Sequence, residues 1–157
     1  MRRRVVLCCF FILFFCCGSV ISGQTSKTGS DDVGAKAAVE GVLRTQQTAW
    51  NRHDLEGFMA GYWNSPELTF FSGAKEQDGW QATMDRYRAT YASPGHEMGK
   101  LEFSGLRIEM LGPDAAFVRG AWLLTMSDGK TPHGLFTPPP PPFPEGWKIV
   151  HDHTSAE

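Results

Sequence analysis

Five consecutive prolines, residues 138–142, limit most strongly which folds this chain can adopt. A proline has no backbone N–H to donate to a β-ladder, so a central strand is excluded there, and only an edge strand, a loop or a polyproline segment is allowed. Strand-like sequence flanks the run on both sides, over residues 134–137 and 147–154. The prolines therefore form either a loop or partner-docking segment, or the damaged remnant of a strand.

The first 23 residues have the layout of a secretory signal peptide, in which Arg2, Arg3 and Arg4 precede an apolar run and a small or weakly polar stretch follows it. We expect cleavage after Gly23 or one residue earlier, and hence a secreted or periplasmic protein. Ile21 is larger than the residue usually found three positions before a cleavage site, so an uncleaved membrane anchor and a lipoprotein stay as alternatives. The apolar run of about thirteen residues is short for a membrane span of about twenty.

Cleavage removes three basic residues and all four cysteines, which are Cys8, Cys9, Cys16 and Cys17. Because the intact chain has a net charge of −2, the remainder carries −5 and has no disulfide, thiol nucleophile or cysteine metal ligand. Core packing alone must hold it together, which is feasible for one domain of this length. Fifteen basic against seventeen acidic residues argue against a nucleic-acid binder, and 12% aromatic residues argue against a disordered chain.

After the signal segment, the sequence predicts a flexible leader over residues 24–31 and a single domain over residues 32–155. Hydrophobic spacing predicts three helices at the start of the domain. The first begins at Asp31 or Asp32 and ends near Trp50, with an inward face of Ala38, Val42, Thr45 and Ala49. Asp54 is expected to cap a second, short helix, and Asp78 a third whose aromatic-rich face is formed by Trp80, Met84, Tyr87 and Tyr91.

The rest of the domain is strand-like. A short strand is predicted over residues 68–71, and further strands over 101–110, 115–125, 134–137 and 147–154. Apolar residues alternate at odd positions up to Phe103 and at even positions from Leu106, which indicates a β-bulge near Gly105 that bends the sheet. Helices followed by long antiparallel strands, one of them bent, predict an α+β domain in which helices lie in a curved sheet.

Four segments together resemble the SnoaL-like branch of the nuclear transport factor two (NTF2-like) superfamily. They are AWNRHDLEGFMAGYW at residues 49–63, Gly79-Trp80, LGPDAA at 111–116 and GWKIVHDHTS at 146–155. The resemblance implies a cone of three N-terminal helices packed in a strongly curved antiparallel sheet, with a pocket between them, and commonly a homodimer. Relatives carry an apolar and basic strand between Phe136 and Trp147, so the prolines are expected to lower stability or to open the sheet locally.

The superfamily includes ketosteroid isomerases, polyketide cyclases and dehydratases, and also binding modules without a known reaction, so membership does not decide the chemistry. The final strand is also similar to the association domain of calmodulin-dependent kinase, which ends in a like His-x-His pattern. In that domain the position corresponding to Thr154 lines the pocket.

The last strand carries the best candidate for chemistry. Its alternation places His151 and His153 on one face and Asp152 and Thr154 on the other. With Thr154 in the pocket, Asp152 lies inside too, where an apolar environment raises the proton affinity of a carboxyl and lets it act as a general acid or base. Tyr62 is the predicted catalytic partner. The alternative is a structural Asp152 that accepts hydrogen bonds from a neighbouring strand or from Arg119.

The predicted ligand-binding residues are mostly aromatic side chains, because tyrosine and tryptophan combine an apolar body with a polar tip. They are Trp50, Trp63, Trp80, Tyr87, Trp122 and the hydroxyl-bearing Thr154. We expect Arg86, Arg88 and Arg119 on solvated faces. An inward Arg119 would instead favour an anionic ligand.

We predict neither a metal nor a cofactor. Two histidines two residues apart on a strand can reach one metal ion, but no third ligand follows at a fixed spacing. After the signal segment the sequence contains no glycine-rich phosphate loop, nucleophile elbow or zinc signature.

Three functions remain open. The first is an exported module that binds a small, mostly apolar organic molecule without turnover. The second is a cofactor-free isomerase, cyclase or dehydratase, similar to ketosteroid isomerases or polyketide cyclases, that uses Asp152 as general acid or base. The third is a structural, homo-oligomeric association domain. In each case we expect no nucleic-acid partner, and membrane contact only through an uncleaved N-terminal anchor.

Overall fold

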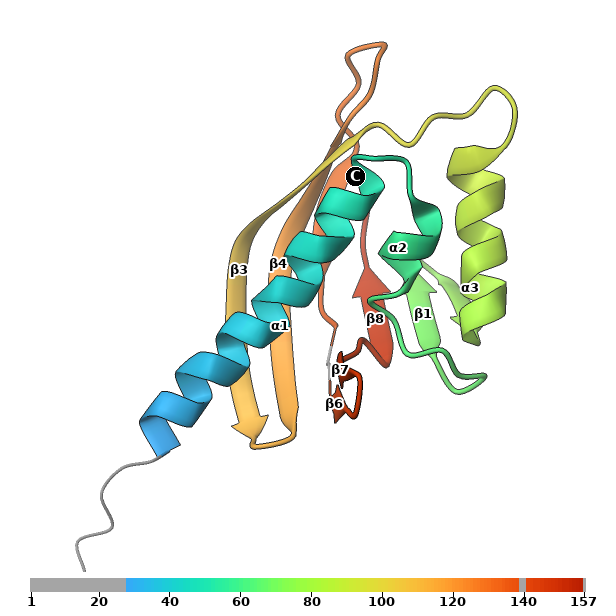
Figure 1. The fold of residues 1–157 in the computed structure, drawn as a ribbon. Helices are drawn as coiled ribbons and strands as arrows, with labels where there is room; N and C mark the ends of the chain where they lie inside the picture. The colour runs from blue at the N-terminus through green and yellow to red at the C-terminus, as the bar shows by residue number, and fades with distance from the viewer. Residues whose placement is uncertain (1–27, 139–140, 157) are drawn as a thin grey trace, which may run out of the picture.

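The computed structural model describes residues 28–138 and 141–156, and for residues 28–30 the backbone alone (Figure 1). The predicted signal peptide and the first part of the leader lie outside these residues. The described residues form three α-helices, α1 (Thr28–Trp50), α2 (Leu55–Met59) and α3 (Trp80–Tyr87), and a π-helical segment, η1 (Arg88–Ala92), continues α3. Because α1 begins at Thr28, the prediction of a flexible leader is wrong for residues 28–31.

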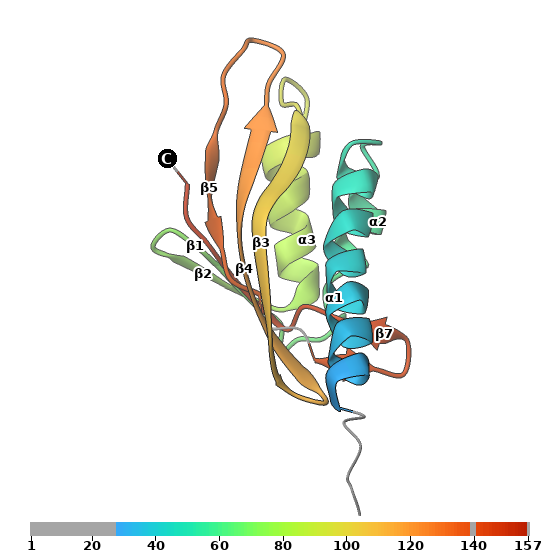
Figure 2. The same cartoon turned by 90° about the vertical axis from the view of Figure 1, so that its left-hand side faces the viewer.

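Six strands form one sheet in the order β2-β1-β8-β5-β4-β3. Their bounds are β1 (Thr69–Ser72), β2 (Lys75–Asp78), β3 (Lys100–Gly112), β4 (Ala115–Thr125), β5 (His133–Phe136) and β8 (His151–Thr154). β1 and β8 are parallel, and the other neighbours are antiparallel. The long helices lie on one side of this sheet (Figure 2). The predicted α+β class, with helices packed against a curved sheet, is confirmed.

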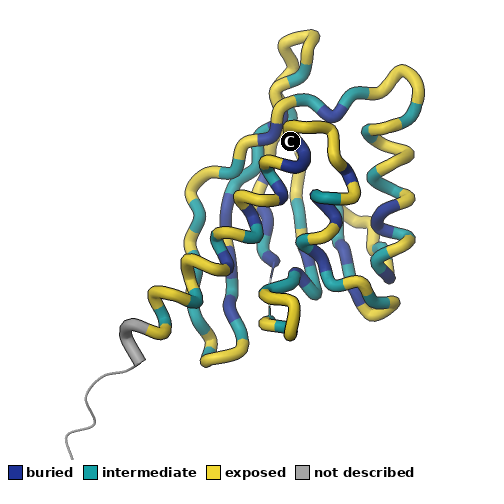
Figure 3. Tube along the Cα trace, in the orientation of Figure 1, coloured by how far each residue is buried: buried dark blue, intermediate teal, exposed yellow. Residues whose placement is uncertain are grey.

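The core lies between this helical layer and the sheet, and its buried residues gather where the C-terminal half of α1, α2 and α3 face the strands (Figure 3). The inward face of α1 differs from the predicted one. Its buried residues are Val39, Leu43, Gln46, Ala49 and Trp50, whereas Ala38 and Thr45 are exposed and Val42 is half-buried. The two faces lie about 100° apart on a helix, and the larger side chains of Val39 and Leu43 bury more apolar area than Ala38 and Thr45.

The helix starts agree with the sequence in one of three places, since α1 begins at Thr28 rather than at Asp31 or Asp32. The Asp54 carboxylate accepts a hydrogen bond from the Gly57 backbone N–H at 2.8 Å, so this cap is confirmed. Asp78 does not cap α3. It ends β2, a strand that the sequence did not indicate, and Gly79 takes the cap position with a φ of 89°, which glycine adopts without strain.

A register shift between Ser104 and Arg107 bends β3 against β4. Gly105 lies at its centre with a φ of 59°, so the predicted β-bulge is confirmed. The bend curves the sheet around the helices and leaves room for a cavity between the two layers.

The proline run interrupts the pairing between β5 and β8, which consists of the single pair Phe136 and Thr154. Two backbone hydrogen bonds flank this pair, from the Thr137 N–H to the His153 carbonyl at 3.0 Å and from the Ser155 N–H to the Leu135 carbonyl at 2.9 Å. Pro138 is fully buried and contributes only an acceptor, since its carbonyl receives the Val118 N–H at 3.2 Å. Among the described residues the pairing of β5 with β8 ends at Thr137, because Pro138 has no N–H to extend it, and a locally opened or less stable sheet stays a prediction.

The predicted strand over residues 147–154 is divided. Its first part, β7 (Gly146–Trp147), pairs with β6 (Pro142–Phe143) in a separate two-stranded ribbon, and only β8 joins the main sheet. Among the described residues, no helix is both long enough and apolar enough to cross a membrane.

Candidate functional site

A cavity of about 140 Å³ lies between the helices and the concave face of the sheet. Its closed end is formed by buried side chains of α1, α2 and β8 and of the segment after α2, among them Leu43, Trp50, Phe58, Tyr62 and Asp152. Its mouth is lined by more exposed residues from β1, α3, η1 and the end of β8, among them Ser72, Arg86, Thr90 and Thr154. The cavity therefore runs from an aromatic interior to an opening between α3 and β8.

Asp152 is the acidic residue at the closed end. It lies in the middle of β8, is aligned with Phe70 of β1, and is only 6% exposed. One carboxyl oxygen, Oδ2, accepts a hydrogen bond from the Tyr62 hydroxyl at 2.7 Å. The other, Oδ1, is buried and has no hydrogen-bond partner among the described residues. A buried carboxyl oxygen without a partner is costly, so Oδ1 is placed to accept a hydrogen bond from a molecule in the cavity.

Burial raises the pKa of Asp152 to about 7, even though the hydrogen bond from Tyr62 acts in the opposite direction. Burial and the nearby Asp152 carboxyl also raise the pKa of Tyr62 and of Tyr87, whose hydroxyls lie within hydrogen-bonding reach of each other. At neutral pH both tyrosines are protonated, and Asp152 is divided between its neutral and charged forms. The carboxyl can therefore accept or donate a proton near physiological pH.

The aromatic walls are held by contacts among themselves and with the backbone. The ring of Trp50 meets Phe58 at 5.0 Å and Tyr91 at 4.9 Å, both edge to face. Its indole N–H donates to the Met98 carbonyl at 3.0 Å. The Gln46 amide donates to the Phe58 carbonyl at 3.0 Å, which ties α1 to α2. The cavity is thus pre-formed by packing, as in most small-molecule sites.

Four of the six predicted ligand-binding residues line this cavity: Trp50, Tyr87, Trp122 and Thr154. Trp63 does not, because Tyr62 pairs with Ile149 in extended backbone and alternation turns the next side chain away. Its ring stacks on Phe143 at 5.5 Å instead.

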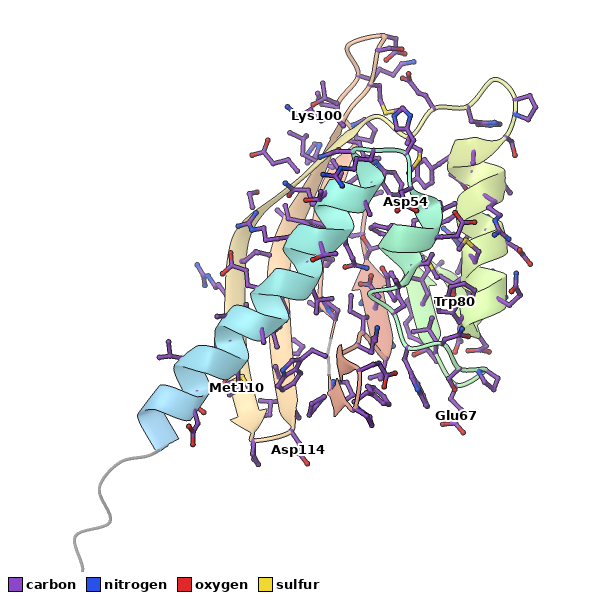
Figure 4. All side chains as sticks on the ribbon, in the orientation of Figure 1. Asp54, Glu67, Trp80, Lys100, Met110 and Asp114 are labelled. Carbon is purple, nitrogen blue, oxygen red and sulfur yellow. The ribbon has the colours of Figure 1, made fainter. Side chains whose placement is uncertain are left out.

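Trp80 is likewise outside the cavity lining. It begins α3 on the side that faces α2, where it is labelled in Figure 4. Its indole N–H donates to the Met59 carbonyl at 3.0 Å, so it fastens α3 to α2.

Arg86 lines the cavity, contrary to its predicted place on a solvated face. Its guanidinium carbon lies 5.5 Å from the centroid of the Phe70 ring. Arg86 stands three residues after the buried Thr83 and four before Thr90, which also lines the cavity, but none of these side chains gives a hydrophobic signal that the sequence could have shown.

The other two arginines are exposed, as predicted. Arg88 pairs with Glu56 at 2.9 Å, and Arg119 lies 3.7 Å from Glu109. The alternative in which Arg119 holds Asp152 is therefore wrong, because the Asp152 partner is Tyr62.

The two histidines of β8 lie on the opposite face of the sheet from Asp152, as the alternation predicted. His151 Nδ1 is 2.6 Å from the Thr69 hydroxyl, and the Phe71 ring meets His151 at 4.9 Å and His153 at 6.1 Å. Burial and the neighbouring His153 lower the pKa of His151. In the part of the chain that the structure describes, no three histidine, cysteine, aspartate or glutamate side chains are grouped to hold a metal ion.

No protein-family model and no curated protein sequence matches the chain. Among solved structures, an NTF2-like protein of unknown function from Shewanella oneidensis is 35% identical, with a TM-score of 0.71, over 76% of this chain and 98% of that one.

Two more distant structures share the fold. One, from Novosphingobium aromaticivorans, is described as a candidate scytalone dehydratase and is 12% identical, with a TM-score of 0.64, over 82% of this chain and 88% of that one. The other, from Thiobacillus denitrificans, is described as a candidate association domain of calcium/calmodulin-dependent protein kinase type II. It is 19% identical, with a TM-score of 0.63, over 75% of this chain and 94% of that one.

Proposed function

Because this chain belongs to the NTF2-like superfamily, whose fold surrounds a cavity but does not fix the chemistry, we propose that it binds one small, mostly apolar organic molecule against Asp152. The observation that carries the proposal is the free Oδ1 atom of Asp152 inside an aromatic cavity. A carboxyl that served packing alone would have both oxygens satisfied, as most buried polar groups do. A ligand hydroxyl or amide can supply the missing hydrogen bond, while Trp50 and Phe58 enclose its apolar part.

The experiment uses a variant that fills the mouth of the cavity. Ser72 is half-buried, lines the mouth and makes no side-chain hydrogen bond to another described residue, so Ser72→Phe adds a ring there with little damage to the fold. Ala74→Phe adds the same ring at an exposed turn position nearby and is the matched control. Binding of phenol and of larger single-ring compounds is measured by ligand-observed NMR.

We expect the unmodified protein and Ala74→Phe to bind such compounds alike, and Ser72→Phe to bind them at least about tenfold more weakly. Equal binding by all three proteins would locate the interaction outside the cavity and contradict the proposal. No binding to any compound of the series would contradict it as well.

A second candidate, acid–base catalysis, is favoured by the pKa of Asp152, which lies at about 7, and by the Tyr62 hydroxyl 2.7 Å from its carboxyl. A carboxyl with this pKa can take a proton from a carbon atom or a hydroxyl group of a bound molecule and return it to another atom of the same molecule. Isomerases and dehydratases need this proton transfer. The distant likeness to a candidate scytalone dehydratase agrees with this class at the level of the fold alone.

Asp152→Asn separates the two candidates, since asparagine keeps the shape and the acceptor for Tyr62 but cannot carry a proton. Turnover of a bound compound that disappears in Asp152→Asn while its affinity stays within about threefold supports catalysis. Turnover that persists in the variant excludes Asp152 as the catalytic group.

We further propose that the protein is exported and forms a homodimer. Export rests on the layout of residues 1–23, and the dimer on the resemblance to SnoaL-like proteins. N-terminal sequencing of material secreted or released from the periplasm tests the cleavage site, and light scattering on eluted fractions tests the mass. A stable oligomer that binds no small molecule would favour an association domain, a role for which the Thiobacillus denitrificans neighbour offers a fold-level analogy.

A further inference from the structure

Among the residues that the structure describes, two charged side chains line the cavity, one at each end. Asp152 occupies the closed end, and Arg86 lies near the mouth with the exposed Thr90. The residue between them is Phe70, which is aligned with Asp152 in the β1–β8 pair and carries the Arg86 guanidinium over its ring at 5.5 Å. An apolar surface therefore lies between the acidic side chain of Asp152 and the cationic side chain of Arg86.

The Arg86 guanidinium forms no ion pair or hydrogen bond with any residue that the structure describes. The neighbouring Asp85 carboxylate and Glu56 are instead paired with Arg88, at 3.5 Å and 2.9 Å. A guanidinium presents a planar fork of donors that matches the two oxygens of a carboxylate. Arg86 thus offers an unused anion-binding group at the entrance.

The size of the cavity limits the ligand to about one ring. Its volume, about 140 Å³, is close to that of an engineered protein cavity of about 150 Å³ that admits benzene. The lining between the two charged ends is largely aromatic, with Phe58, Phe70 and Tyr87 around the space. A second ring would have to extend through the mouth.

The geometry points to a single-ring aromatic acid as the ligand class, with its carboxylate on Arg86 and a hydroxyl at the opposite end of the ring on Oδ1 of Asp152. This inference rests on the proposed binding function and adds to it the charge of the ligand and the orientation of the ligand in the cavity. A neutral ring compound leaves Arg86 without a partner. An amine without an acid group adds positive charge to a cavity that already contains Arg86.

The test compares 4-hydroxybenzoate with its neutral methyl ester and with benzoate, by titration calorimetry on the full mature chain. The first comparison removes the anion and the second removes the hydroxyl. We expect 4-hydroxybenzoate to bind at least about tenfold more tightly than either, the size expected for one hydrogen bond to a charged group.

Variants assign the preference to Arg86. Arg86→Met keeps the apolar stem on Phe70 and removes the donors, so it should abolish the preference for the acid over the ester. Arg86→Lys restores the charge and should restore part of the preference. Arg88→Met is the matched control two residues further along the chain, where the side chain is exposed, and should change neither affinity.

The outcomes separate this inference from the proposed function. If the ester binds wild type as tightly as the acid, or if Arg86→Met keeps the preference, the assignment of an aromatic acid is overturned while cavity binding stands. If none of the three compounds binds, both proposals fail. A thermal melt of each variant within about 3 °C of wild type shows that the comparison is made on folded protein.

Discussion

Replacement of Asp152 by asparagine is expected to change how the stability of the protein depends on pH. The ordinary pKa of this carboxyl is 3.8, and burial raises the pKa of Asp152 to about 7 in the folded state. Between these two values the folded chain holds a proton that the unfolded chain has released. The free energy of unfolding therefore falls as the pH rises through this window, and is flat above it.

The size of the effect follows from the displacement of the pKa by about three pH units, each worth about 1.4 kcal/mol. Wild type is expected to lose about 4 kcal/mol of stability from this group between pH 4 and pH 8. Asparagine is neutral throughout and still accepts the Tyr62 hydrogen bond. Asp152→Asn should therefore match wild type near pH 4 and exceed it by about 4 kcal/mol near pH 8.

The measurement is urea unfolding of both proteins at half-unit steps from pH 4 to pH 8, with the difference in free energy plotted against pH. His151, whose lowered pKa makes stability rise with pH, affects both proteins equally and cancels in the difference. Asp114→Asn, a substitution in the exposed β3–β4 turn labelled in Figure 4, is the matched control and should give a flat difference. A flat difference for Asp152→Asn would refute the argument that burial neutralises this carboxyl.

Three further predictions concern the Tyr62–Asp152 hydrogen bond, the proline run and the core. Tyr62→Phe removes the hydrogen bond that lowers the pKa of Asp152, so the carboxyl should titrate above 7 by NMR; an unchanged or lower midpoint would contradict this. Replacing residues 138–142 with strand-forming residues should restore donors beside β8 and raise the Tm by several degrees, whereas an unchanged Tm would make the prolines a harmless loop. Met59→Ala, at a side chain with 0% exposure, should cost about 2–5 kcal/mol in urea unfolding, against less than about 0.5 for Val33→Ala at 69% exposure; similar losses at both positions would contradict the assigned core.

The resemblance to NTF2-like proteins is confirmed, and most of the fold follows from local patterns. Alternation in residues 151–154 is enough to place the two histidines on the opposite face of the strand from Asp152, because successive side chains of a strand point to opposite faces. The parity switch near Gly105 locates the bulge for the same reason. An alternating pattern predicts the buried face of a strand reliably, because a shift of one residue would move every side chain to the opposite face.

The buried face of α1, in contrast, does not follow from the sequence pattern alone. Two stripes one residue apart, one through Ala38 and one through Val39, both have helical spacing, and only the sheet decides which one is buried. The buried Gln46 is polar and gives no hydrophobic signal, although its amide joins α1 to α2.

Long-range contacts explain the remaining differences at the site. Tyr62 turns toward Asp152 and Trp63 away from it because the chain after α2 pairs with Ile149, which lies far along the sequence. Arg86 enters the cavity lining because the ring of Phe70 on β1 accepts its guanidinium. Neither contact can be predicted from the sequence next to the residue that it positions.

The most direct test of a ligand-binding cavity at Asp152 is the NMR titration of its side-chain carboxyl with and without phenol. In the free protein the carboxyl should titrate near 7. With saturating phenol, whose hydroxyl donates to the free Oδ1, the resonance should shift and the midpoint should move downward, because a donated hydrogen bond favours the charged form. An unchanged resonance and midpoint at phenol concentrations far above any measured dissociation constant would contradict the account.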